Sequence, residues 1–140
     1  MLRVTADTNI LISGITFPGG KPSRFLDLAR SGKINLVVSD AILDEMAVVL
    51  ARKFHFAPED VDEARMRVIA MARTVKAAVH LDIIKEDPPD NRILECAVAA
   101  GSDLIVTGDK DLLRLKTYDS IGIVTVSDFL DLEKGQKHEP

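Results

Sequence analysis

Short apolar runs alternate with longer segments of helical spacing along the whole chain. Each apolar run is bounded by polar residues, glycine or proline, which is typical of a buried strand between turns. This pattern predicts strands at residues 2–6, 34–38, 78–81, 104–106 and 123–126, of which the third has the weakest pattern. It predicts helices at residues 9–15, 23–31, 40–53, 58–75, 91–100, 111–115 and 127–132.

The alternation of strands and helices defines the expected fold class. Strands that are joined by helices form a parallel sheet with right-handed crossovers and helices on both faces. We therefore expect an α/β fold with a central parallel sheet of about five strands, in a single domain of residues 1–132 followed by a frayed polar tail of residues 133–140. Ligands of such sheets bind beyond the carboxyl ends of the strands.

The composition limits the class of protein further. The chain has 140 residues, of which 46% are hydrophobic, and this is enough for one domain with a full core. No apolar run approaches the roughly 20 residues of a membrane helix. The chain begins directly with a strand pattern, so we expect no signal peptide. The single cysteine, Cys96, fits a reducing cytosol, and its small neighbours predict a buried packing role rather than a nucleophile.

The net charge of −4 is unfavourable for binding nucleic acid unless the acidic residues are concentrated in one place. A cation bound at such a place would change the local sign of the charge. Basic residues gather in two segments, which either contact phosphates or form solvated helix faces, and a solvated face is the commoner case. The first segment contains Lys21, Arg24, Arg30 and Lys33, and the second contains Arg65, Arg67, Arg73 and Lys76.

Four acidic residues stand where a parallel sheet places its chemistry. Asp7 follows the first strand and Asp109 follows the fourth, so both are expected at carboxyl ends of strands. Asp90 opens a helical segment. Glu45 lies at the edge of the apolar stripe of another helix, whereas its neighbour Asp44 points to solvent. A charge beside the core is costly unless it is paired or bound to a metal. The four carboxylates therefore predict a shared site for a hard divalent cation.

Several of these acids also have an ordinary structural explanation. Asp90 has the sequence context of a helix N-cap, and Asp87 is suited to shaping the turn before it. Either Asp109 or Asp111 can cap the helix that follows them. Glu45 can extend from its stripe into solvent or pair with an arginine. From position alone, the structural and the metal-binding interpretations of Glu45 are about equal.

The triplet Asp7-Thr8-Asn9 is polar and directly follows a buried strand. Helix capping would use one of these residues and leave the Thr8 hydroxyl and the Asn9 amide to hold the Asp7 carboxylate or a metal-bound water. With Mg²⁺ or Mn²⁺ at the acids, the expected chemistry is hydrolysis of a phosphodiester by a metal-activated water. Whether one or two ions act is left open. The three histidines are scattered, and none is assigned a role.

Four motifs, in the order of the chain, resemble those of the PIN-domain ribonucleases. They are Asp7-Thr8-Asn9 after the first strand, Glu45 in the helix after the second, the segment DNRILECA from Asp90 to Ala97, and the segment LIVTGDKD from Leu104 to Asp111. The likeness spans residues 2–130, and the most similar group is the VapC-like toxins of prokaryotic toxin–antitoxin modules. The resemblance implies a Mg²⁺- or Mn²⁺-dependent endoribonuclease.

The resemblance also implies roles for individual residues. Carried over motif by motif, the catalytic and metal-binding residues are Asp7, Glu45, Asp90 and Asp109, and the supporting residues are Asn9, Thr107 and Asp111. Glu95 matches no catalytic position and is left out. The implied partners are an RNA substrate, a small antitoxin protein and a second copy in a homodimer, in the cytoplasm and away from membranes. Toxicity in a cell does not follow from the fold.

Two other classes of protein compete with the nuclease. A phosphohydrolase of the haloacid-dehalogenase type also begins with an aspartate after the first strand and has a later Gly-Asp pair. That chemistry needs a second aspartate two residues after the first, where this chain has Asn9. The other competitor is a binding module with the same fold and no catalysis, and the four intact acids argue against it.

Overall fold

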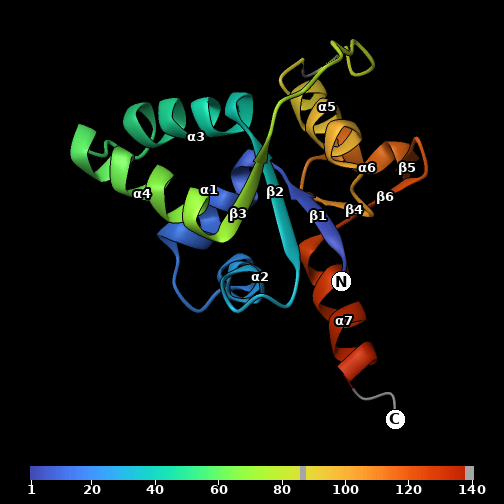
Figure 1. Ribbon diagram of the computed structural model, residues 1–140. Coiled ribbons are helices and arrows are strands. Elements are labelled where there is room, and N and C mark those ends of the chain that lie inside the picture. Colours follow the sequence, from blue (N-terminus) through green and yellow to red (C-terminus); the bar gives the residue numbers. More distant parts are fainter. Residues whose placement is uncertain (86–87, 138–140) are drawn as a thin grey trace.

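The structure is a computed structural model that describes residues 1–85 and 88–137, with side chains described as far as Lys134. Helices and strands alternate through most of it, as the periodicity predicts (Figure 1). The strands are β1 (Arg3–Ala6), β2 (Asn35–Ser39), β3 (Ala72–Val75), β4 (Leu104–Val106), β5 (Thr117–Tyr118) and β6 (Ile121–Val124). The helices are α1 (Thr8–Thr16), α2 (Lys21–Arg30), α3 (Asp40–Arg52), α4 (Pro58–Met71), α5 (Asp90–Ala100), α6 (Lys110–Leu115) and α7 (Val126–Lys137).

The strands form a six-stranded sheet in the order β3-β2-β1-β4-β6-β5. All neighbouring pairs are parallel except β5 and β6, which are antiparallel. The predicted α/β fold class is therefore confirmed, with one strand more than expected. β1 lies in the interior of the sheet, and the chain continues from it to β2 on one side and later to β4 on the other. The space beyond the carboxyl ends of β1 and β4 is therefore the switch point of the topology, where sheets of this class bind ligands.

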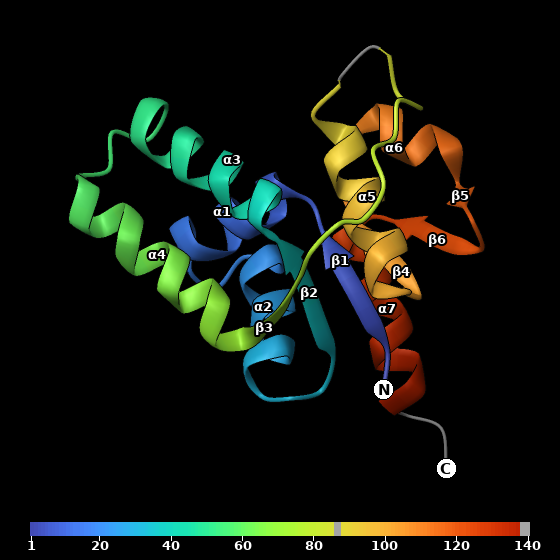
Figure 2. The ribbon, with the colours of Figure 1, turned by 45° about the horizontal axis from the view of Figure 1, so that its top comes forward.

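Helices cover the sheet on both sides. Figure 2 shows α1, α2, α3 and α4 grouped on one side of β1 and β2, with α5 and α6 on the other. The central strands contribute Val4, Leu36 and Ile105 to the core, and each is at most 1% exposed. Such burial on both faces is what continuous apolar runs in parallel strands predict. Among the described residues, no helix is both long and apolar enough to cross a bilayer.

The third strand lies earlier in the chain than the sequence predicts. α4 ends at Met71 and β3 begins at Ala72, whereas residues 78–81 belong to no strand. Ala72 and Val75 continue the apolar spacing of α4, which in the sequence favours a helix as far as residue 75. In the structure they pair in parallel with Leu36 and Ser39 of β2. Backbone hydrogen bonds to the edge of β2 outweigh the periodicity of a few residues, because strand preference depends on tertiary context.

Two further differences lie near the C-terminus. β5 forms a hairpin with β6, and the turn between them holds Asp119 and Ser120 at φ values of 51° and 66°. Such turns usually carry glycine or asparagine, so this hairpin has little signal in the sequence. α7 continues to Lys137, through most of the tail that was expected to fray.

Candidate metal centre

The candidate site begins at the junction of β1 and β4. The two strands pair in parallel with Ala6 opposite Val106, so the next residues, Asp7 and Thr107, emerge side by side at the sheet edge. The backbone N–H of Asp7 donates to the carbonyl of Val106 at 3.1 Å, which continues the pairing by one residue. The sequence-predicted position of Asp7 beyond the carboxyl end of a strand is thus observed directly.

The Asp7 side chain is only 5% exposed and is held at both oxygens. Its Oδ1 accepts a hydrogen bond from the backbone N–H of Ile10 at 2.9 Å, so Asp7 is the N-cap of α1. Its Oδ2 accepts a hydrogen bond from the Thr107 hydroxyl. Burial raises the pKa of Asp7 above its usual value, the hydrogen bonds from Thr107 and Ile10 oppose this shift, and the charge of Asp109 adds to it. A cation beside Asp7 would favour its ionised form.

Asp109 is fixed by the same region of backbone. Its N–H donates to the Thr107 hydroxyl oxygen at 3.0 Å, and its Oδ1 accepts from the N–H groups of Asp111 at 2.8 Å and Leu112 at 3.3 Å. Asp109 is therefore the N-cap of α6, and Asp111 lies in the first turn of that helix. Thr107 links Asp7 and Asp109 through a single hydroxyl.

Glu45 reaches the site from α3, where it is half-buried beside the fully buried Met46. The Thr8 hydroxyl donates to its Oε2 at 3.0 Å. Thr8 therefore holds Glu45. The hydroxyl that holds the Asp7 carboxylate is that of Thr107, and not that of Thr8 as the sequence suggested. Asp44 faces outward as predicted and pairs with Arg65 at 2.9 Å.

Asp90 enters the site from the start of α5 and is 8% exposed. The cap position of α5 is Pro89 and Asp90 is the first helical residue, so Asp90 does not serve as the N-cap. Asp87, which is expected to shape the turn before this helix, lies outside the residues that the structure describes.

The residues after Asp90 fasten a neighbouring segment to α5. The Asn91 Oδ1 accepts from the N–H groups of Ile83 at 2.9 Å and Ile84 at 2.8 Å, and its Nδ2 donates to the carbonyl of Ile84 at 2.9 Å. Glu95 accepts from the N–H of Leu81 at 2.6 Å. This contact gives Glu95 a structural role, in keeping with its exclusion from the predicted site.

All four predicted acids line one small cavity of about 50 Å³, together with Thr8, Asn9, Pro89 and Ile93. Two of these acids, Asp90 and Asp109, form a closer group with Asp111, which does not line this cavity: each of the three carboxylates places an oxygen within 4.8 Å of the others. Two oxygens on opposite sides of a Mg²⁺ ion lie about 4 Å apart, so small side-chain rotations would let these groups share one ion. The donor set is entirely carboxylate, which suits Mg²⁺ or Mn²⁺. The family resemblance implies a supporting role for Asp111, and the structure places its carboxylate in this group of three.

A second cavity, of about 630 Å³, adjoins the first and shares Asp7, Asn9 and Asp109 with it. Its other lining residues are Ile10, Ser13, Gly108, Lys110, Asp111 and Arg114. The predicted site residues do not include Ser13, Lys110 or Arg114. The sequence does contain a signal for Lys110 and Arg114, because they are four residues apart on the helix that Asp109 caps.

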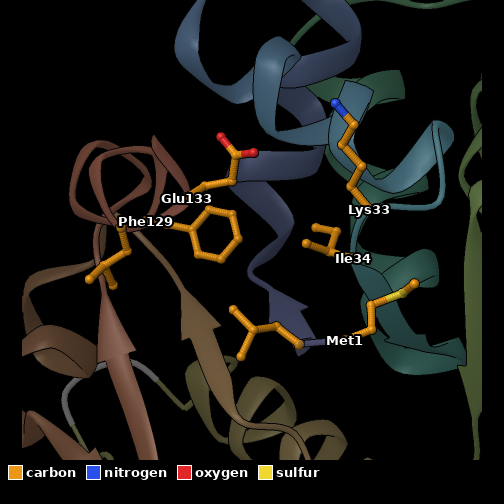
Figure 3. Close-up of a pocket in the computed structure, with 7 residues that line it drawn as sticks. Met1, Lys33, Ile34, Phe129 and Glu133 are labelled. Carbon is orange, nitrogen blue, oxygen red and sulfur yellow. The ribbon is translucent and has the colours of Figure 1, made fainter. Parts of the chain in front are cut away.

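A third cavity, of about 370 Å³, is apolar for the most part and lies away from the acids (Figure 3). Met1 and Leu2 precede β1, and Ile34 precedes β2, so this cavity is at the amino ends of the strands. Phe129 and Glu133 of α7 close its other side. It lacks converging carboxylates, and ligands of parallel sheets bind at the opposite edge.

Cys96 is fully buried, which confirms its predicted packing role. Burial raises the pKa of its thiol to about 11, and hydrogen bonds with Thr5 and Ser39 oppose the shift only partly. A thiol with this pKa is not a nucleophile at neutral pH.

Comparison with known proteins agrees with this architecture. The family model of the PIN domain matches residues 3–111, and the chain belongs to this family. An uncharacterized protein of Methanocaldococcus jannaschii, MJ1680, is 28% identical over 119 residues, which are 82% of this chain and 76% of that protein. VapBC2 from Rickettsia felis, solved bound to a DNA fragment from its promoter, has a similar fold, with a TM-score of 0.60. That likeness covers 87% of this chain and 97% of the other at 14% identity, and it is a likeness of fold.

Proposed function

We propose that this protein is a Mg²⁺- or Mn²⁺-dependent endoribonuclease that hydrolyses phosphodiester bonds in RNA. The observation that carries the proposal is the convergence of Asp7, Glu45, Asp90 and Asp109 on one cavity at the switch point of the sheet. These acids come from four separate segments of the chain: the end of β1, α3, the start of α5 and the end of β4. We assign them as the metal-holding catalytic residues, with Asp111 as a fifth ligand.

The surrounding residues keep the acids in place. When bound, a divalent cation supplies Lewis acidity for the phosphate and lowers the pKa of a water molecule. Thr107 orients Asp7, and Thr8 orients Glu45, so that each carboxylate presents its remaining lone pairs in a defined direction. Asn9 is exposed and lines both cavities, and its amide is suited to hydrogen-bonding the substrate.

The charge distribution is compatible with an RNA substrate despite the net charge of −4. Five of the 22 acidic and two of the 18 basic residues line the two adjoining cavities, which leaves 17 acidic and 16 basic residues elsewhere. Bound cations would neutralise the acidic pocket, and the rest of the surface would then not repel a polyanion.

Cleavage of a fluorescently labelled RNA of mixed sequence tests the proposal. We expect the purified protein to cut this RNA with Mn²⁺ and to leave it intact with EDTA. Asp90→Asn should reduce the rate by at least about a hundredfold, since it removes a charged ligand at nearly constant size. Asp62→Asn, at an exposed position of α4, is the matched control and should cut normally. Intact RNA with Mn²⁺, without a rise in thermal stability, would favour the binding module instead.

The biological setting that we propose is that of a VapC-like toxin. The motifs in the sequence and the fold shared with VapBC2 support this assignment. It implies a homodimer in the cytoplasm that a small antitoxin inhibits. The expected finding is a neighbouring gene for a small DNA-binding protein whose product co-purifies with this chain and lowers its cleavage rate. A neighbouring product that neither binds nor inhibits would remove the toxin assignment and leave the nuclease.

We also assign the nuclease activity to residues 1–132. Phe129 and Leu130 of α7 are buried, whereas Leu132 and the residues described after it are more exposed. A chain that ends at Leu132 should therefore keep its fold and its cleavage rate, which a cleavage assay beside the full chain would check.

A further inference from the structure

The cavity of about 630 Å³ extends the cavity of about 50 Å³ that the four acids line, which we call the acidic pocket, in one direction. It shares Asp7, Asn9 and Asp109 with the pocket and continues from them to Ser13 and Arg114. Its volume of about 630 Å³ lies within the range of small-molecule sites. A substrate that places a phosphate at the acids would therefore have a continuation of its chain in this cavity.

Two short helical faces form the walls of this cavity. Asn9 and Ser13 are four residues apart on α1, and Lys110 and Arg114 are four residues apart on α6. Residues at this spacing lie on the same face of a helix. One wall is therefore neutral and able to hydrogen-bond, and the other carries the cations Lys110 and Arg114 beside the carboxylates of Asp109 and Asp111.

The cationic wall stands directly beside the acids. Arg114 lies 3.3 Å from the Asp111 carboxylate and its side chain is 69% exposed. Lys110 is also exposed, and of the side chains that the structure describes none forms an ion pair with it. Both cations can therefore reach a ligand without first breaking a buried contact. Asp7, Asp109 and Asp111 also line this cavity, so an anionic group would be attracted to Lys110 and Arg114 once a bound cation neutralises these carboxylates.

We propose that this cavity binds the nucleotide on one side of the scissile phosphate, and that Lys110 and Arg114 contact the flanking phosphate of the RNA. This inference rests on the proposed nuclease function. Arginine and lysine form charge-assisted hydrogen bonds with phosphate oxygens. Ser13 and Asn9 face the same space and offer neutral groups to the sugar and base. The contact holds the RNA against the repulsion of the carboxylates, so it acts on substrate binding more than on the chemical step.

The test compares short RNA substrates that differ in the phosphates they carry. The first is a dinucleotide, whose only phosphodiester is the scissile one. The others extend it by one nucleotide at the 5′ or at the 3′ side. We expect one of the two extensions, and not the other, to lower KM for the wild type. The double variant Lys110→Gln/Arg114→Gln should lose this gain, with KM raised by about tenfold to a hundredfold and kcat within about threefold.

Salt dependence gives a second readout that a structural role would not change. Each phosphate neutralised on a single strand contributes about 0.7 to the slope of log affinity against log salt, so the double variant, which loses its contact with one phosphate, should lose about 0.7 of that slope. Arg52→Gln/Lys53→Gln, at the end of α3, is the matched control with the same change in charge. Lys110→Arg/Arg114→Lys keeps both charges and should keep the wild-type KM and slope. Thermal unfolding of each variant confirms that it is folded.

The outcomes separate the two proposals. If the wild type cleaves no RNA with Mn²⁺, the nuclease function fails and this inference fails with it. If the wild type cleaves but the glutamine variant has the same KM and salt slope, the nuclease function stands and this inference is overturned. Equal gains from the 5′ and 3′ extensions would also overturn it, because a cavity on one side of the acids cannot serve both.

Discussion

The hydroxyl group of Thr107 joins the two central strands of the site by donating a hydrogen bond to the Asp7 carboxylate. The same oxygen accepts the backbone N–H of Asp109 at 3.0 Å. Thr107 is fully buried, so its hydroxyl is shielded from bulk water. Thr107 does not line the cavity of about 50 Å³, but its hydroxyl sets the positions of Asp7 and Asp109, which do.

Replacing Thr107 by valine should therefore damage the site and the fold together. Valine has nearly the same shape, but it removes the Thr107 donor from the Oδ2 of Asp7 and leaves the N–H of Asp109 without its acceptor. We expect a loss of about 1–3 kcal/mol in the free energy of unfolding, measured by urea denaturation, and weaker binding of Mn²⁺. Thr107→Ser keeps the hydroxyl and should retain most of both. If valine and serine behave alike, the hydroxyl is not what holds Asp7.

Replacing Asp7 by asparagine should stabilise the metal-free protein. Burial raises the pKa of Asp7 above its usual value of 3.8, so the folded state binds this proton more tightly than the unfolded chain. The stability from this group is complete below pH 3.8 and is lost as the pH rises through the higher folded pKa. Asparagine carries no charge and remains a good N-cap, so the variant should lack this pH dependence. Urea unfolding in EDTA across the acidic to neutral range measures the difference.

Adding Mn²⁺ should make the wild type more stable than Asp7→Asn, which is the reverse of the order expected without metal. A cation that binds only the folded wild type raises its unfolding free energy with concentration, and the asparagine variant should gain little. Parallel gains in the two proteins would remove Asp7 from the set of metal-holding residues.

Removing the Asn91 side chain should loosen the segment before α5. Asn91→Ala leaves the N–H groups of Ile83 and Ile84 without their acceptor, at a cost of about 1–3 kcal/mol for each if both stay buried. Hydrogen exchange at these two amides should become much faster, and Mn²⁺ should bind more weakly because Asp90 is the adjacent residue. Asn91→Asp keeps the acceptor oxygen and should protect both amides better than alanine. Unchanged exchange in the alanine variant would contradict this role.

The Cys96 thiol should be unreactive in the folded protein. It is fully buried, and burial raises its pKa from 9.0 to about 11. The folded state therefore favours the neutral thiol, and this contribution to stability is complete below pH 9 and is lost as the pH rises through about 11. Iodoacetamide near neutral pH should label Cys96 only after denaturation. Rapid labelling of the native chain would show that the thiol is more accessible than this packing allows.

Much of the architecture and the approximate location of the site follow from local patterns. The apolar runs at β1, β2 and β4 are buried on both faces, and continuous apolar runs are the usual sign of such strands. Because Asp7 and Asp109 follow two of these strands, the sequence places both at one sheet edge. Glu45 and Asp44 were separated by their angles on a helix, and the structure confirms both directions.

Local patterns do not predict two other features of the fold. Ala72 and Val75 have helical spacing but lie in a strand, since β2 offers them an edge with which to pair. The β5–β6 turn carries Asp119 and Ser120 at positive φ without the usual glycine, so composition gives little sign of it.

The sequence determines that this chain forms an α/β domain with carboxylates at the ends of its strands, because periodicity and residue order are properties of the chain itself. Only the tertiary structure decides which polar group meets which carboxylate. Thr8 contacts Glu45 across 37 residues, and Thr107 contacts Asp7 across 100. Those partners depend on strand order and helix packing, and hydrogen bonds form only over distances of about 3 Å, so no local pattern could select them.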